Sequence, residues 1–126
     1  MKSILLVDDD LLVLNVLERL LRSQQDAWRV SQARGGTEAL ASIADARFDL
    51  LITDIRMPEP DGAQVIRDAH RRWPSMKIIA MSGGGQPDEA QLCRELLALG
   101  ADEILQKPFS AQDLFALVRR LLAPAT

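Results

Sequence analysis

The chain has 126 residues, a net charge of −3 and 48% hydrophobic residues, values typical of one soluble globular domain. The net negative charge argues against direct binding to nucleic acid. Cys93 is the single cysteine, so an internal disulfide is excluded. No stretch is long and apolar enough to cross a membrane, and residues 1–3 lead into an apolar run without the pattern of a signal peptide. These features predict a cytoplasmic protein without a membrane contact.

Short apolar runs alternate with segments of helical periodicity along the whole chain. Taken in order, strands are expected at residues 4–7, 28–33, 49–53, 77–81 and 101–106. Helices are expected at residues 11–21, 38–46, 63–73 and 87–99, followed by a last helix that Ser110 caps and Leu122 ends. Residues 1–122 therefore form one domain, and residues 123–126 form a C-terminal tail.

The strands are continuous apolar runs rather than alternating ones, and this pattern is typical of a parallel sheet covered on both faces. Strands that alternate regularly with helices indicate an α/β fold of the doubly wound type. The second expected strand contributes only Arg34 and Gly35 beyond its end and is expected at an edge of the sheet. In such folds, ligands bind in the crevice beyond the carboxyl ends of the strands.

The central apolar run, residues 50–53, ends at Asp54 and is followed by a loop that contains Pro58 and Pro60. Proline lacks an N–H and restrains the residue before it, so this loop is stiff. Asp61-Gly62 then marks a turn and the beginning of a helix. Asp54 therefore lies at the end of a buried strand, where an unpaired charge is costly and requires a cation or a reaction.

Four of the expected strands end at polar residues, namely Asp8-Asp9, Asp54, Ser82 and Lys107. Three carboxylates at one rim would repel one another, and a hard divalent cation such as Mg²⁺ relieves this repulsion. A carboxylate beside a metal can also attack phosphorus and form an aspartyl phosphate. Ser82 and Lys107 would then bind the phosphoryl oxygens.

These residues give the chain a close resemblance to the receiver domains of two-component response regulators, and to chemotaxis regulators in particular. The resemblance is carried by the Asp8-Asp9 pair, by Asp54-x-x-Met57-Pro58-x-x-Asp61-Gly62, by the strand that ends at Ser82 and by Lys107-Pro108-Phe109. It covers essentially the whole chain. It implies a flavodoxin-like (βα)5 sheet with the strand order 2-1-3-4-5.

The resemblance also implies a role for each site residue. Asp54 would be the phosphoacceptor, and Mg²⁺ would be held by Asp8, Asp9, Asp54 and the backbone carbonyl of Arg56. The donor would be a histidine kinase or a histidine phosphotransfer protein, and the switch would control a downstream protein or an output domain. Lys107-Pro108 would be a cis peptide bond, which occurs mainly before proline.

The chain departs from the family pattern at two places. Receivers usually carry Tyr or Phe three residues before the lysine, where this chain has Ile104. The loop of residues 83–86 is also expected to be a few residues longer and more flexible than the common pattern, in which Ala often follows the hydroxyl residue. These departures predict that the usual aromatic switch is absent and that Ser82 and its loop carry the rearrangement.

Other functions compete with a phosphorylation switch. An Asp-nucleophile phosphatase would carry a second aspartate two residues after the nucleophile, where this chain has Arg56. A flavin-binding electron carrier would require a Ser/Thr-rich loop after the first strand, which here is acidic. A degenerate receiver that acts only as an interaction module is disfavoured by the complete acidic set, although Ile104 keeps this alternative open.

Overall fold

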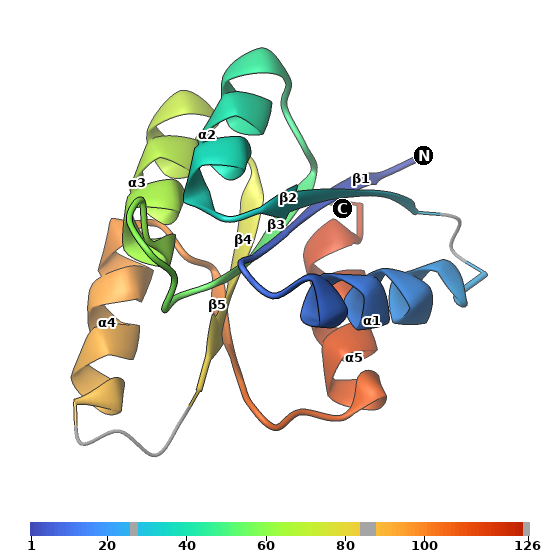
Figure 1. Ribbon diagram of the computed structural model, residues 1–126. Helices are drawn as coiled ribbons and strands as arrows, with labels where there is room; N and C mark the ends of the chain where they lie inside the picture. Colours follow the sequence, from blue (N-terminus) through green and yellow to red (C-terminus); the bar gives the residue numbers. More distant parts are fainter. Residues whose placement is uncertain (26–27, 84–87, 125–126) are drawn as a thin grey trace.

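The computed structural model describes residues 1–25, 28–83 and 88–124, and it contains one five-stranded parallel sheet with helices on both faces (Figure 1). The strands are β1 (Ser3–Asp8), β2 (Arg29–Arg34), β3 (Leu50–Asp54), β4 (Lys77–Ser82) and β5 (Glu103–Gln106). The helices are α1 (Leu11–Arg22), α2 (Gly36–Asp45), α3 (Gly62–Arg72), α4 (Glu89–Leu99) and α5 (Ala111–Leu122). The order β2-β1-β3-β4-β5 confirms the predicted doubly wound fold and the edge position of β2.

The sheet separates two apolar layers, one beneath α2, α3 and α4 and the other beneath α1 and α5 (Figure 1). Successive residues of β1 alternate between them, because side chains of a strand point to opposite faces. Leu5 and Val7 belong to the first layer, whereas Ile4 and Leu6 belong to the second. Both faces of the central strands are buried, which explains why these strands are uninterrupted apolar runs in the sequence.

Most element boundaries lie within two residues of those predicted, and backbone pairing explains two of the differences. The strand expected at residues 28–33 ends one residue later because Arg34 still pairs with Asp8. The last strand begins at Glu103, after the Ala101 N–H has donated to the Leu96 carbonyl at the end of α4. The expected start of α4 at residue 87 lies outside the described residues, and the helix begins at Glu89.

Side-chain caps fix several of the helix starts that face the carboxyl ends of the strands. Asp10 accepts a hydrogen bond of 2.9 Å from the Leu12 N–H and caps α1. Asp61 caps α3 in the same way, with 3.0 Å to the Gln64 N–H. The predicted capping box at Ser110 is present and opens α5. Among the described residues, no helix is both long enough and apolar enough to span a membrane.

Candidate functional site

The predicted polar residues meet at one rim of the sheet because the parallel strands all point their carboxyl ends toward it. Asp8 is the last residue of β1, Asp54 of β3 and Ser82 of β4, and Lys107 directly follows β5. The register of the central strands brings these ends level, since Asp54 pairs with Met81, the residue before Ser82. The fold therefore brings together four strand ends that are far apart in the sequence.

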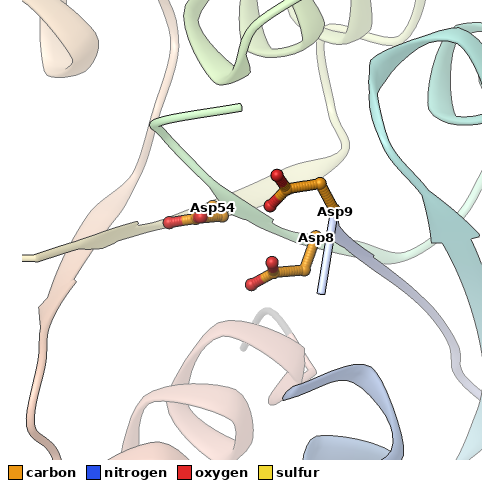
Figure 2. Close-up of side chains that lie close together, drawn as sticks. All are labelled: Asp8, Asp9 and Asp54. Carbon is orange, nitrogen blue, oxygen red and sulfur yellow. The ribbon is translucent and has the colours of Figure 1, made fainter. Parts of the chain in front are cut away.

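Three carboxylates form the centre of the site, those of Asp8, Asp9 and Asp54 (Figure 2). Each offers one oxygen, and these oxygens lie within 4.8 Å of one another. Their environments differ, because Asp8 is only 2% exposed and the Asp54 side chain 14%, whereas Asp9 is exposed. Hard oxygen ligands at this spacing suit a small divalent cation such as Mg²⁺.

Asp8 carries the strongest sign that the cluster is incomplete without a cation. Its Oδ1 accepts a hydrogen bond of 2.9 Å from the Asp10 N–H. Its Oδ2 is buried and has no hydrogen-bond partner among the residues that the structure describes. Burial raises the pKa of Asp8 from 3.8 to about 6, and the nearby charge of Asp54 contributes to the rise. A buried oxygen of this kind is costly unless it is paired, so the donor set fits a metal ion.

Lys107 supplies positive charge to the same cluster. Its Nζ lies 3.3 Å from Asp54 Oδ1 and 4.0 Å from Asp8 Oδ2. Asp54 Oδ1 also accepts a hydrogen bond of 3.0 Å from the Ile55 N–H. The Lys107–Pro108 bond is cis, as the resemblance implied. The lysine side chain is 32% exposed and lies beside both carboxylates, so it can bind an oxyanion that arrives there.

Ser82 is only 1% exposed. Its hydroxyl donates a hydrogen bond to Oε2 of Glu89 in the first turn of α4. The other Glu89 oxygen, Oε1, accepts a hydrogen bond of 3.2 Å from the Arg56 guanidinium. Glu89 was not among the predicted site residues, because on sequence alone it resembles any acidic residue at a helix start. The sequence contains only two signals of a polar contact with Glu89. These are Ser82 at the end of β4 and Arg56, two residues beyond the end of β3.

The remaining predicted residues lie near this network. The Arg56 side chain is 52% exposed and also lies 3.6 Å from Asp88, while its carbonyl remains a predicted ligand. Ile104 pairs with Ala80 across the sheet and is partly buried against the layer beneath α2, α3 and α4. Of the loop predicted to rearrange, Gly83 is described and residues 84–86 lie outside the described residues.

Comparisons with known proteins agree with this geometry. A family model of the response regulator receiver domain matches residues 4–119. The chain is 36% identical over 123 residues to the transcriptional regulatory protein CpxR of Escherichia coli, a match that covers 97% of this chain and 50% of CpxR. It is also 36% identical over 119 residues to the response regulator MprA of Mycobacterium ulcerans, covering 94% of this chain and 49% of MprA. The chain thus spans about half the length of these curated relatives.

Solved structures of similar length share the fold. The response regulator TrrA of Thermotoga maritima, in complex with Mg²⁺-BeF, superimposes with a TM-score of 0.82 at 30% identity, covering 97% of this chain and 100% of TrrA. The chemotaxis protein CheY4 of Vibrio cholerae gives a TM-score of 0.83 at 29% identity, covering 97% of this chain and 99% of CheY4. The family match, the relatives and the shared fold show that the chain belongs to the receiver domains of two-component response regulators.

Proposed function

We propose that the chain is a phosphorylation-controlled switch in which Asp54 accepts a phosphoryl group in a Mg²⁺-dependent reaction. The donor would be a phosphohistidine of a histidine kinase or of a histidine phosphotransfer protein. The observation that carries the proposal is the cluster of Asp8, Asp9 and Asp54 beside Lys107, in which a buried Asp8 oxygen has no hydrogen-bond partner among the described residues. The proposal covers residues 1–122 as the switching unit and a cytoplasmic location.

In the proposed reaction, a carboxylate oxygen of Asp54 attacks the phosphorus of the donor in line with the bond that breaks. The P–N bond of phosphohistidine breaks, and the imidazole leaves with its electron pair and takes up a proton. Asp8, Asp9, Asp54 and the Arg56 carbonyl would hold Mg²⁺, which when bound offsets negative charge on the carboxylates and the phosphoryl group. Lys107 Nζ, 3.3 Å from Asp54, would bind one phosphoryl oxygen, and the Ser82 hydroxyl would donate a hydrogen bond to another.

The product would act as a signal rather than leave as a released compound. The aspartyl phosphate carries about −1.5 to −2 charge in place of the −1 of the Asp54 carboxylate, and the phosphoryl group binds one of two conformations better than the other. The same carboxylates and lysine would assist hydrolysis of the aspartyl phosphate by water, which resets the switch. A downstream protein or an output domain would read the surface of α4, β5 and α5. Direct binding to nucleic acid is not part of the proposal, because the net charge is −3.

Intact mass spectrometry after incubation with phosphoramidate and Mg²⁺ tests the proposal. We expect one added phosphoryl group on the wild-type chain, and none when EDTA removes the metal or in Asp54→Asn. Glu59→Gln is the matched control, since it changes an exposed acid of the same loop and should be labelled like the wild type. A wild-type chain that gains no phosphoryl group would instead be a degenerate receiver. Full labelling of Asp54→Asn would refute the assignment of the phosphoacceptor.

A further inference from the structure

Glu89 connects the site to α4 through contacts that the phosphorylation chemistry alone does not require. The Ser82 hydroxyl donates to Glu89 Oε2, and the Arg56 guanidinium donates to Glu89 Oε1 over 3.2 Å. Arg56 is the second residue after Asp54, so Glu89 bridges the end of β4 and the loop that follows the phosphoacceptor. Glu89 is only 6% exposed, which is unusual for a glutamate at a helix start.

The neighbouring Asp88 shows that these contacts reflect more than a favourable helix dipole. Asp88 also lies near the start of α4 and within 3.6 Å of Arg56, yet its side chain is 70% exposed. A surface position would satisfy the dipole equally well. Burying the Glu89 carboxylate instead carries a desolvation cost that its hydrogen bonds must offset. The buried position therefore requires a reason beyond capping, and the contact with Ser82 supplies one.

The chemistry of the hydroxyl makes two partners of Ser82 mutually exclusive. A serine hydroxyl has one hydrogen to donate. In the structure this hydrogen goes to Glu89, whereas the proposed function requires the Ser82 hydroxyl to donate to a phosphoryl oxygen at Asp54. Both acceptors are anionic, so each hydrogen bond is charge-assisted and stronger than a bond to a neutral acceptor. A second negative group beside Glu89 would also repel its carboxylate.

We propose that Glu89 is a positioning residue that holds the Ser82 hydroxyl in the unphosphorylated state and competes with the phosphoryl group for it. This inference rests on the proposed function. Phosphorylation of Asp54 takes the hydroxyl from Glu89, and the first turn of α4 loses its bond to the end of β4. Glu89 thus lowers the affinity of the site for a phosphoryl group and links occupancy of the site to the position of α4.

Binding of beryllofluoride in the presence of Mg²⁺ tests this competition, with the bound fraction measured by ¹⁹F NMR. Glu89→Gln keeps the shape of the side chain and removes the charge of the acceptor. We expect it to bind beryllofluoride about fivefold more tightly than the wild type. Asp88→Asn is the matched control, because it removes a charge from the adjacent residue, which also lies near Arg56. Its affinity should stay within about twofold of the wild type.

A double-mutant cycle with Ser82→Ala separates the contact from a general effect of charge. Glu89→Gln should have a much smaller effect in the Ser82→Ala background, because no hydroxyl is left to compete for and only relief of the charge repulsion remains. Glu89→Asp, which keeps the charge but shortens the side chain, should bind beryllofluoride more tightly than the wild type, and it also serves if Glu89→Gln does not fold.

Several outcomes would overturn the inference. These are an unchanged affinity in Glu89→Gln, or a full effect that persists without the Ser82 hydroxyl. A wild-type chain that binds no beryllofluoride with Mg²⁺ would refute the proposed function, and with it this inference. The two failures are distinguishable, because only the second abolishes binding by the wild type.

Discussion

Asp8 and Asp9 are adjacent in sequence, but burial separates their chemistry. Asp8 is 2% exposed, one of its oxygens has no hydrogen-bond partner among the described residues, and burial raises its pKa to about 6. Asp9 is exposed to solvent. Asp8 is therefore the carboxylate whose ionisation is costly for the metal-free fold, and the one that gains most from a cation. The site is built at the expense of stability, as is common where charged groups converge.

The pKa of Asp8 predicts how the stability of the metal-free protein depends on pH. Its folded pKa of about 6 lies above the ordinary value of 3.8, so the folded state binds this proton more tightly than the unfolded state. The resulting stabilisation is fully present below the ordinary pKa and is lost as the pH rises through the folded pKa. Between pH 5 and pH 7 the loss amounts to about 1 kcal/mol of the free energy of unfolding.

Urea unfolding in EDTA at both pH values measures this loss, with Asp8→Asn as the variant that removes it. The wild type should lose about 1 kcal/mol more than Asp8→Asn over this range. Glu59→Gln, which changes an exposed acid of the loop after β3, is the matched control and should lose as much as the wild type. Added Mg²⁺ at pH 7 should stabilise the wild type more than Asp8→Asn, because it binds only the folded site. Equal losses in the wild type and Asp8→Asn would contradict the prediction.

Gly62 shows how a single small residue fixes the geometry around Asp54. A Cβ atom at Gly62 would lie 2.2 Å from the Asp54 carbonyl oxygen and 2.6 Å from the Ile55 Cα. These are backbone atoms of the strand end and cannot move aside as a flexible side chain would. Only glycine therefore allows α3 to begin so close to β3, which was visible in the sequence only as a turn signal.

Gly62→Ala should lower the free energy of unfolding by about 1–3 kcal/mol, since overpacking of a tight site has costs of this size. Because the clash displaces the backbone of Asp54, phosphorylation by phosphoramidate should slow as well. Gly83→Ala is the control, because a Cβ at Gly83 meets no atom of the described residues within 4 Å. Denaturant titration of both variants checks the prediction. Equal stability of the two variants would contradict it, because the backbone that follows β3 would then have moved aside without cost.

At the scale of whole elements, α1 presents an apolar surface that the fold leaves uncovered. Leu12 and Val16, one helical turn apart, are 75% and 58% exposed. They line a surface groove together with Pro108 and Phe109, and Lys107 lines the same groove. Since Lys107 also contacts Asp54, this apolar surface is continuous with the proposed phosphoacceptor site. We expect the protein that donates the phosphoryl group to dock there.

Replacing both apolar residues, in Leu12→Ser/Val16→Ser, should slow phosphoryl transfer from a histidine phosphodonor protein by tenfold or more at limiting concentration. Each buried aliphatic side chain contributes about 1.5–3 kcal/mol to an interface of this kind. Labelling by phosphoramidate should be unchanged, because a small donor needs no docking surface. Leu97→Ser is the control, since Leu97 is 45% exposed on the distant α4. If transfer from the protein donor and labelling by phosphoramidate slowed equally, the substitutions would have damaged the phosphoacceptor site rather than the docking surface.

The elements themselves could be predicted from sequence because their signals are local. Continuous apolar runs indicated the strands, and capping residues such as Asp61 and Ser110 indicated helix starts. The boundaries were less accurate where a distant partner decides them. One example is Ala101, whose N–H closes α4 rather than opening β5. Such choices depend on which groups the fold brings together, and the chain order alone does not specify them.

In the molecule as a whole, the site could be predicted because a parallel sheet brings the last residues of its strands close together, however far apart they are in the sequence. Parallel strands deliver their last residues to one rim, so strand-end residues of known type are enough to place Asp8, Asp54 and Lys107 together. Glu89 escaped this reasoning, since it lies at a helix start rather than a strand end. The different burial of Asp8 and Asp9 also escaped it, because the packing of neighbouring elements decides which one is covered.

The position of Ile104 determines how far a signal from the site can spread through β5. Ile104 is partly buried, β-branched and without a polar group, so it has neither the freedom nor the hydrogen bond of an aromatic hydroxyl switch. Ser82 has a polar route instead, through Glu89 into the first turn of α4. The conformational change that follows phosphorylation should therefore pass from β4 to α4, while β5 keeps its position.

Amide chemical shifts recorded with and without Mg²⁺ and beryllofluoride should map this route. We expect the largest changes outside the acidic cluster at Ser82, Gly83 and the first turn of α4, and small changes at Ile104. Ser82→Ala should keep the response of the acidic cluster but lose that of α4, because the hydroxyl that links them is gone. Ile104→Val, which preserves a β-branched apolar side chain, should leave both responses intact. Large changes at Ile104 that survive in Ser82→Ala would mean that β5 itself moves, and that the signal reaches the α4, β5 and α5 surface without the serine.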